Sequence, residues 1–409
     1  MNKRNLGHWG ILFVVVLGIS GVVFGMHVLD TNDQQTMRTT NKLHAKQTRQ
    51  EIAYDALRSA QQRTNKKKSA LDKKNLGKKT PKFSAKFTKD LKAKKFVGTA
   101  LVVKNNKVVY QRSFGKANAK KHKANQATSQ FLINSIQKSM TGILVMRAAQ
   151  AGQLHLTDKL SKYYPQIKGS NKVTLRQMLD MEAGITGELK PETTLTEPAV
   201  YKYASQQAKI NPAKINQFNY QPISYTLLAG ILRKVTHESY YQLFYEHVVT
   251  PLSLNHTSFA QLKHTGTTIG YSGTVPGNYS QPHVPSAKDM AVQIATGNAT
   301  MSAGDVFRTE RAIIQGTLLK KAGGANTLHR SASMTAHYAG GLYHLDRIGY
   351  YGHGVGDDYE GTFVLSRNGK TGVILLSNNY YKRGMYPTWS TEDLAMNTFR
   401  NVVAVNKLS

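Results

Sequence analysis

The sequence contains no cysteine and is short of acidic residues. Its 409 residues include 55 lysines and arginines but only 23 aspartates and glutamates, which gives a formal net charge of +32. The absence of cysteine excludes disulfides, thiolate zinc sites and a cysteine nucleophile. The shortage of acids leaves a basic surface that attracts polyanions, such as nucleic acid, anionic lipid head groups or wall polymers that carry phosphate. The alternative is that the basic surface serves only solubility.

Charge is missing altogether from residues 9–29. This run of about 21 residues is long enough to cross ~30 Å of hydrocarbon at 1.5 Å per residue. Two basic residues precede it, whereas Asp30 and Asp33 follow it, so the positive-inside rule places residues 1–8 in the cytoplasm and the bulk of the chain outside. A cleaved signal peptide is the alternative, but the run is longer than a usual signal core and has no clear A-x-A site. We therefore predict an uncleaved, single-pass membrane anchor.

Residues 30–95 form a basic polar linker in this prediction. Their first half, roughly residues 34–63, has neither glycine nor proline and is compatible with a helix. Their second half is dense in lysine and poor in apolar side chains, so burial cannot offset the entropy of ordering it, and we expect a mobile spacer. Such a spacer is either an electrostatic stalk against an anionic membrane or polymer or a solubilising linker. We expect no nucleic acid partner, because the segment lies outside the cell and lacks interleaved aromatic residues.

Residues 96–409 show the pattern of a folded domain. Alternating segments on either side of Asn105-Asn106 predict one hairpin, and those on either side of residues 367–369 predict a second. Helical patterns dominate residues 130–250, and a last helix is expected over about residues 392–405. Strands at both ends with helices between them predict an α+β fold. In this fold an antiparallel sheet is built from both chain ends and is flanked by helices. A helical subdomain lies beside the sheet, and the transmembrane helix precedes the whole domain.

A serine and a lysine lie one turn apart at the start of a predicted helix. Apolar residues recur at helical spacing over residues 136–148, and Gly152 is a plausible end of the helix. Ser135 and Lys138 therefore share one face of the first turn, in the S-x-x-K arrangement. A serine becomes a nucleophile when a neighbouring base accepts its proton, and a lysine whose charge is disfavoured by burial can be that base. An isolated match also fits a capping serine beside a solvated lysine.

The surroundings of this pair resemble penicillin-binding proteins, class C β-lactamases and related esterases. The resemblance covers about residues 96–405 and is carried by the opening strands, the region of the active serine, the segment that often ends in H-T-S-G, and the stretch with the second motif: residues 96–118, 131–165, 173–186 and 219–259. It implies a β-lactamase/transpeptidase-like fold, with the serine between the helices and the sheet.

The second motif of class C relatives is Y-x-N, and Tyr220-Gln221-Pro222 occupies its place here. The resemblance implies that Tyr220 relays a proton to the leaving group. The alternative is a loop tyrosine packed on the surface. Pro222 departs from the pattern, because proline lacks the amide side chain that would contact substrate. This departure argues against ordinary recognition of β-lactams or stem peptides.

The third motif is K-T-G in many relatives and H-x-G in some. Residues 370–372 match the letters K-T-G but lie in or beside a predicted turn, so we interpret them as a coincidence. His353-Gly354-Val355 matches the position in the family, where the histidine stands in for lysine. The resemblance implies that His353 orients or polarises substrate and that Gly354 lets substrate approach the strand. The alternative is a structural histidine in a glycine-rich bend, and Val355 replaces the usual glycine.

The oxyanion that forms during attack needs preorganised hydrogen-bond donors. The resemblance implies that these are the backbone N–H groups of Ser135 and, by position, Gly356. No phosphate-binding loop is evident, and we expect neither a metal nor a cofactor, because the histidines are scattered and read as ordinary surface or packing residues: His44, His155, His237 and His247.

Together these features imply acyl transfer through an acyl-serine. We expect a serine hydrolase of the cell surface that acts on a D-alanyl ester or amide in the envelope, with teichoic acid or peptidoglycan as its partner. Some family members are esterases that remove D-alanine from teichoic acids, and they share the anchor, S-x-x-K and a following tyrosine. A D,D-carboxypeptidase is the close alternative, followed by a β-lactamase and by a catalytically inactive protein that binds wall polymer. The lack of cysteine fits a Gram-positive bacterium.

Overall fold

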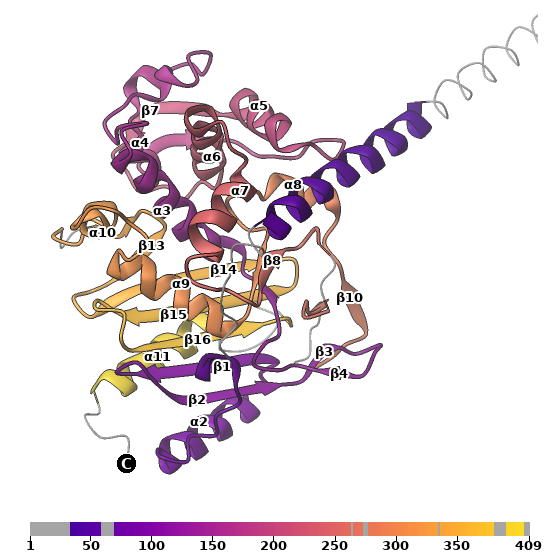
Figure 1. Ribbon diagram of the computed structural model, residues 1–409, viewed down its shortest axis with the longest axis vertical. Coiled ribbons are helices and arrows are strands. Elements are labelled where there is room, and N and C mark those ends of the chain that lie inside the picture. Colours follow the sequence, from indigo (N-terminus) through magenta and orange to yellow (C-terminus); the bar gives the residue numbers. More distant parts are fainter. Residues whose placement is uncertain are drawn as a thin grey trace, which may run out of the picture.

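A seven-stranded antiparallel sheet lies at the centre of the fold (Figure 1). The computed structural model describes residues 33–58, 69–262, 265–272, 277–333, 336–379 and 390–404. Strand β1 pairs with β16, so segments from both ends of the folded region meet within the sheet, as the two hairpins predict. In spatial order the strands are β12 (Tyr338–Ala339), β13 (Leu342–Leu345), β14 (Gly349–Gly356), β15 (Tyr359–Ser366), β16 (Gly372–Ser377), β1 (Gly98–Lys104) and β2 (Lys107–Phe114).

Two hairpins of this sheet close through two-residue turns. Asn105 and Asn106 join β1 to β2 with φ of +49° and +64°. Asp357 and Asp358 join β14 to β15 with φ of +51° and +62°. Turns with two positive φ values match the twist of the strands, and asparagine and aspartate adopt them more readily than most residues. The first turn was predicted from the asparagine pair, whereas the second was not recognised.

Helices cover both faces of the sheet. On one face lie α2 (Pro81–Ala93) and α11 (Thr391–Ala404), which confirms the predicted last helix. The opposite face packs against α9 (Ala303–Gln315) and the helical region, in a second and larger core. Because neighbouring side chains of a strand point to opposite faces, the buried apolar residues of the sheet divide between these two cores.

The prediction of a mobile spacer was wrong for residues 69–95. Helix α2 places Phe83, Phe87 and Leu91 four residues apart, and the last two are buried against the sheet. The short turn η1 (Ala70–Asp72) also packs on β2 and α9. The low total apolar content was misleading, because three apolar residues at helical spacing form a complete packing stripe while the lysines face solvent.

The helical region lies beside the sheet and carries several short strands (Figure 1). Its helix α3 (Gln137–Gln150) packs against α6 (Ile223–Thr236), α9 and α10. The other helices are α4 (Leu175–Leu179), α5 (Glu197–Gln207), α7 (Tyr240–Phe244), α8 (Ala287–Val292) and α10 (Gly324–Leu328). Short 3-10 turns are η2 (Asn134–Ile136), η3 (Leu160–Lys162) and η4 (Ser170–Lys172), and η5 (Tyr245–Val249) is one turn of π-helix. The remaining strands are β3 (Lys116–Asn118), β4 (Lys123–Ala124), β5 (Phe131–Leu132), β6 (Ala183–Thr186), β7 (Lys209–Ile215), β8 (Thr257–Phe259), β9 (Gly270–Ser272), β10 (Gln281–His283) and β11 (Ala299–Met301).

A further helix spans residues 33–58 and projects from the domain (indigo in Figure 1). The predicted anchor at residues 9–29 and the cytoplasmic residues 1–8 lie outside the described residues. Within the part of the chain that the structure describes, no helix combines the length and apolar character that crossing a bilayer requires.

Candidate active site

Ser135 and Lys138 are in direct contact at the start of α3. Ser135 lies in the turn η2, which runs straight into this helix. Lys138 Nζ donates one hydrogen bond to Ser135 Oγ at 2.8 Å and another to the carbonyl oxygen of Thr296 at 3.2 Å. The lysine is only 1% exposed, so a solvated lysine beside a capping serine does not describe this pair. The amine is placed to take the hydroxyl proton.

The residue before the serine ties this turn to the sheet. Asn134 has φ of +47°, in the left-handed region where asparagine is enriched among residues other than glycine. Its Nδ2 donates a hydrogen bond to the carbonyl oxygen of Gly356 in β14 at 3.0 Å. Strained backbone of this kind clusters at active sites. Asn134 was not among the residues predicted from the sequence, where the available signal was the asparagine itself, a residue type that adopts positive φ more readily than most.

Tyr220 lies beside the same amine, in the loop before α6. Lys138 Nζ is 5.1 Å from the centre of the Tyr220 ring. That ring stacks on Tyr343 with centroids 6.4 Å apart and 11° between the planes, and Tyr338 meets it edge-on at 5.9 Å. The structure thus brings together the three residues that were predicted to be catalytic.

Strand β14 passes so close to the nucleophile that only glycine fits at position 354. A Cβ on Gly354 would overlap the carbonyl oxygen of Ile133 and lie 2.9 Å from the backbone nitrogen of Ser135. Gly352 shares this face, where a Cβ would collide with the ring of Phe363. The glycines therefore let the strand approach the serine, whereas the role predicted for Gly354, to let substrate approach the strand, stays a prediction.

His353 lies on the other face of β14, because side chains alternate along a strand. Its Nε2 is 3.1 Å from Glu360 Oε1, and its Nδ1 is 3.5 Å from Glu392 Oε2 of α11. Burial lowers the pKa of His353, but the hydrogen bond and charge of Glu360, together with the charges of Glu392 and Asp393, outweigh burial and raise it. The structure places His353 with these acids and not with Ser135.

The position of Gly356 follows from the adjoining turn. Gly356 faces Tyr359 across that turn, and Val355 faces Glu360. Residues that flank a two-residue turn exchange both backbone hydrogen bonds, and the next pair is a non-bonded one. The N–H of Gly356 is therefore directed at β15. The N–H of Val355 is directed at the opposite edge, where pairing with β13 ends at Tyr351.

The letters K-T-G at residues 370–372 fall at the other end of the sheet. Gly372 opens β16, and Lys370 accepts a backbone hydrogen bond from Asn106 in the first hairpin turn. Strand β15 separates this turn from the one at residues 357–358. Residues 370–372 therefore lie away from Ser135, which agrees with the interpretation that their match to K-T-G is a coincidence.

Two aspartates form an acidic rim next to the site. Asp357 and Asp358 follow Gly356 directly, and their side chains are 15% and 16% exposed. Asp357 Oδ2 accepts a hydrogen bond from Gln293 Nε2 at 3.0 Å. Asp358 Oδ2 lies 2.7 Å from His283 Nδ1. This rim was not predicted from the sequence, although two aspartates directly after a glycine-rich strand are the signal of such a turn.

A buried carboxyl group supports α3 from behind. Ser139 Oγ donates a hydrogen bond to Glu310 Oε1 at 2.7 Å, and no hydrogen bond to a described residue reaches Glu310 Oε2, which is buried. Burial raises the pKa of Glu310 to about 8. Glu310 of α9 packs against α3 through Ser139, and Ser139 is the residue that follows Lys138.

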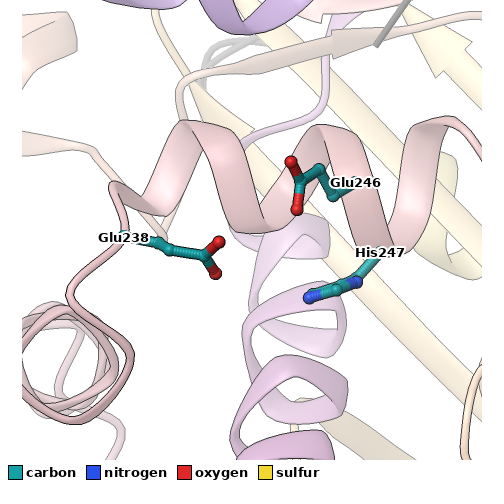
Figure 2. Close-up of side chains that lie close together, drawn as sticks. All are labelled: Glu238, Glu246 and His247. Atoms are coloured by element: carbon teal, nitrogen blue, oxygen red, sulfur yellow. The ribbon is translucent and has the colours of Figure 1, made fainter. Parts of the chain in front are cut away.

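Three potential metal ligands lie together at the far end of α3 (Figure 2). Glu238, Glu246 and His247 approach within 4.8 Å of one another, a grouping that was not expected. Arg58 pairs with Glu246 at 2.5 Å, and an Arg147 nitrogen lies 3.2 Å from His247 Nδ1. Burial, then the charge of Arg147, lowers the pKa of His247 to about 4. We assign no metal here, because two guanidinium groups already contact these side chains.

Comparison with known proteins identifies the fold and the family. The family model described as Beta-lactamase matches residues 83–395. The protein PbpX of Bacillus subtilis (strain 168) is 27% identical over 344 residues, which cover 83% of this chain and 85% of that protein. The crystal structure of FmtA from Staphylococcus aureus superposes with a TM-score of 0.71 at 21% identity, over 87% of this chain and 95% of that chain.

A shorter match names an activity. The teichoic acid D-alanine hydrolase of Staphylococcus aureus is 29% identical over 181 residues, which cover 44% of this chain and 45% of that protein. The chain thus matches less than half the length of that hydrolase. The family match, by contrast, spans both the helical region and the sheet, between which Ser135 and Lys138 lie. The chain therefore belongs to the β-lactamase family of serine hydrolases.

Proposed function

We propose that the protein hydrolyses D-alanyl esters of a wall polymer through an acyl-Ser135 intermediate. The contact between Ser135 and Lys138 carries this proposal, because it supplies a nucleophile and its base within hydrogen-bond distance. The named activity of the Staphylococcus aureus hydrolase supports the choice of substrate. It also supports a teichoic acid as the partner.

In this mechanism Ser135 Oγ attacks the ester carbonyl while its proton moves to Lys138 Nζ. The tetrahedral intermediate then collapses, and the bond to the leaving alcohol breaks as that alcohol takes a proton by way of Tyr220. Water attacks the acyl-serine and releases D-alanine and the free serine. The alcohol of an ester is a better leaving group than the amine of an amide. A site with an altered second motif can therefore still hydrolyse esters.

We further propose that Val355, and not Gly356, supplies the second oxyanion donor. The N–H of Gly356 is directed at Tyr359, whereas that of Val355 points to the open edge of β14 beside the nucleophile. The first donor is the N–H of Ser135. Two such donors stabilise the negative oxygen of the intermediate without rearranging.

The charges around the site favour an ester with a free ammonium group over a substrate that ends in a carboxylate. A D-alanyl ester carries an ammonium on the carbon next to its carbonyl, whereas a stem peptide ends in a carboxylate. Asp357 and Asp358 follow the strand that faces Ser135, and His353 is engaged by two glutamates. Asp358 is paired with His283, but the nearest partner of Asp357 is the uncharged amide of Gln293, so the charge of Asp357 can attract the ammonium and would repel the carboxylate.

A paired assay tests the proposal. The full-length chain in detergent is given D-alanylated teichoic acid in one reaction and a stem pentapeptide in the other, and free D-alanine is measured. We expect release from the polymer alone, and loss of that release in Ser135→Ala. Release from the pentapeptide alone would replace the esterase with a D,D-carboxypeptidase. Rapid opening of a β-lactam would instead indicate a β-lactamase.

We also propose that the domain faces outward from the membrane of the cell, held by residues 9–29. The charge distribution around this run supports that orientation. Protease treatment of intact cells, followed by detection of the two ends of the chain, tests it. Protection of residues 96–409 in intact cells would contradict the proposed orientation.

A further inference from the structure

One face of the helix at residues 33–58 fixes it to the domain. His44 Nδ1 lies 2.6 Å from the carbonyl oxygen of Thr194, and Ile52 is fully buried. Asp55 accepts a hydrogen bond from Ser239 Oγ at 2.9 Å. These contacts span three turns, so the helix is held in one orientation and its other face has a defined direction.

That other face carries a stripe of cations. Arg38, Lys42, Lys46 and Arg49 are all exposed, and their spacing of three or four residues places them along one side of the helix. Successive charges lie about 5 to 6 Å apart along the axis. No acidic residue occurs between Asp33 and Glu51 in the sequence, and none of the four cations forms an ion pair with an acid of the described residues.

A groove runs beside this stripe. It has a volume of about 490 Å³ and is lined by three of the cations, Lys42, Lys46 and Arg49, together with Ala45, Gln50, Ala53 and Leu262. The lining therefore combines charged side chains with the apolar side chains of Ala45, Ala53 and Leu262. Among the described residues, no aromatic side chain lines the groove that could stack nucleic acid bases.

We propose that this groove binds the phosphodiester backbone of an anionic wall polymer. The phosphates contact Lys42, Lys46 and Arg49, and the carbon units between them pack on Ala45, Ala53 and Leu262. The groove belongs to the helix at residues 33–58 and makes no use of Ser135. Binding there is therefore independent of the hydrolase proposal, and it raises the local concentration of polymer around the domain.

The test measures binding of poly(glycerol phosphate) without D-alanine, so that turnover plays no part. The full-length chain in neutral detergent is compared with the groove variant Lys42→Gln/Lys46→Gln/Arg49→Gln. A matched control, Lys82→Gln/Lys89→Gln/Lys92→Gln, removes the same charge from the exposed side of α2. Affinity is measured by fluorescence anisotropy between 50 and 200 mM salt.

We expect the groove variant to bind at least about tenfold more weakly, and its log–log salt slope to fall by roughly two, since each phosphate contact releases about 0.7 counterions. The control should stay within about twofold of the parent chain, and acylation of Ser135 by a small ester should be unchanged in both variants. Equal losses in the two variants would overturn the site, because net charge alone would explain them. Binding of anionic phospholipid vesicles that needs the groove, without polymer binding, would also overturn it and identify the surface as a membrane contact.

Discussion

The side chain of Asn134 donates a hydrogen bond to the carbonyl oxygen of Gly356 at 3.0 Å, and this bond joins the turn of the nucleophile to the sheet. One partner comes from η2 and the other from the end of β14, 222 residues later in the chain. Because the serine is the next residue, the bond sets the distance between the nucleophile and the strand that lies along it.

Replacing Asn134 therefore separates a backbone effect from a hydrogen-bond effect. Asn134→Ala loses the bond and strains a residue at positive φ, so the free energy of unfolding should fall by about 2 kcal/mol. Asn134→Gly tolerates the positive φ and loses only the bond, about 1 kcal/mol. Urea denaturation measures both values, and an alanine variant as stable as the glycine variant would contradict the assigned strain.

Lys138→Met removes the proton acceptor while preserving the length of a buried side chain. We expect kcat/KM for a D-alanyl ester to fall by at least about 100-fold, because Ser135 loses the base that takes its proton. The fold should persist, since no buried carboxylate among the described residues depends on the amine. Intact mass spectrometry after mixing with an acylating probe checks the result, and rapid acylation at Ser135 in this variant would refute the assigned base.

Val355→Pro tests the proposed oxyanion donor. Proline removes one N–H and is tolerated where that N–H points away from the neighbouring strand. We expect kcat to fall by roughly 100-fold or more, whereas Val355→Ala retains the N–H and should stay close to the parent chain. If the proline variant kept its activity, the donor would have to lie elsewhere.

Asp357→Asn tests recognition of the substrate ammonium. The amide oxygen can still accept the hydrogen bond from Gln293, but the negative charge is gone. KM for the D-alanyl ester should rise about tenfold, since hydrogen bonds to charged groups contribute about 1.5–3 kcal/mol. An N-acetyl-D-alanyl ester lacks the ammonium and serves as the control substrate. Equal effects on both esters would indicate a structural role for Asp357.

Glu310 should make stability depend on pH. Burial raises its pKa from the ordinary value of 4.5 to about 8, so the folded state holds a proton that the unfolded state releases between these values. The stability that this group contributes is complete below pH 4.5, falls as the pH rises to about 8, and changes no further once both states have lost the proton. Glu310→Gln keeps the acceptor for Ser139 and removes the titration. Its unfolding free energy should change less between pH 6 and about 9 than that of the parent chain, and parallel profiles would contradict this assignment.

Local patterns determined much of the fold. The asparagine turn, the alternating strands and the helical spacing after Ser135 each follow from interactions between residues close in sequence, and the structure contains the hairpins and helices they predict. The proximity of Ser135 and Lys138 is of the same kind, because one helical turn brings them together. The run at residues 9–29 stays a prediction.

Other features depend on contacts that no local pattern encodes. Helix α2 is held by apolar residues that bury only when the sheet is present, and His353 turns to Glu392 because the register of β14 and the packing of α11 decide which face it occupies. The contact between Asp358, in the turn after β14, and His283 of β10 likewise joins residues far apart in the chain. The sequence determined the asparagine turn, the helix after Ser135 and the spacing of the catalytic pair through local geometry. The tertiary structure alone decided which side chains face the serine, because strand register and layer packing are set by residues far apart in the chain.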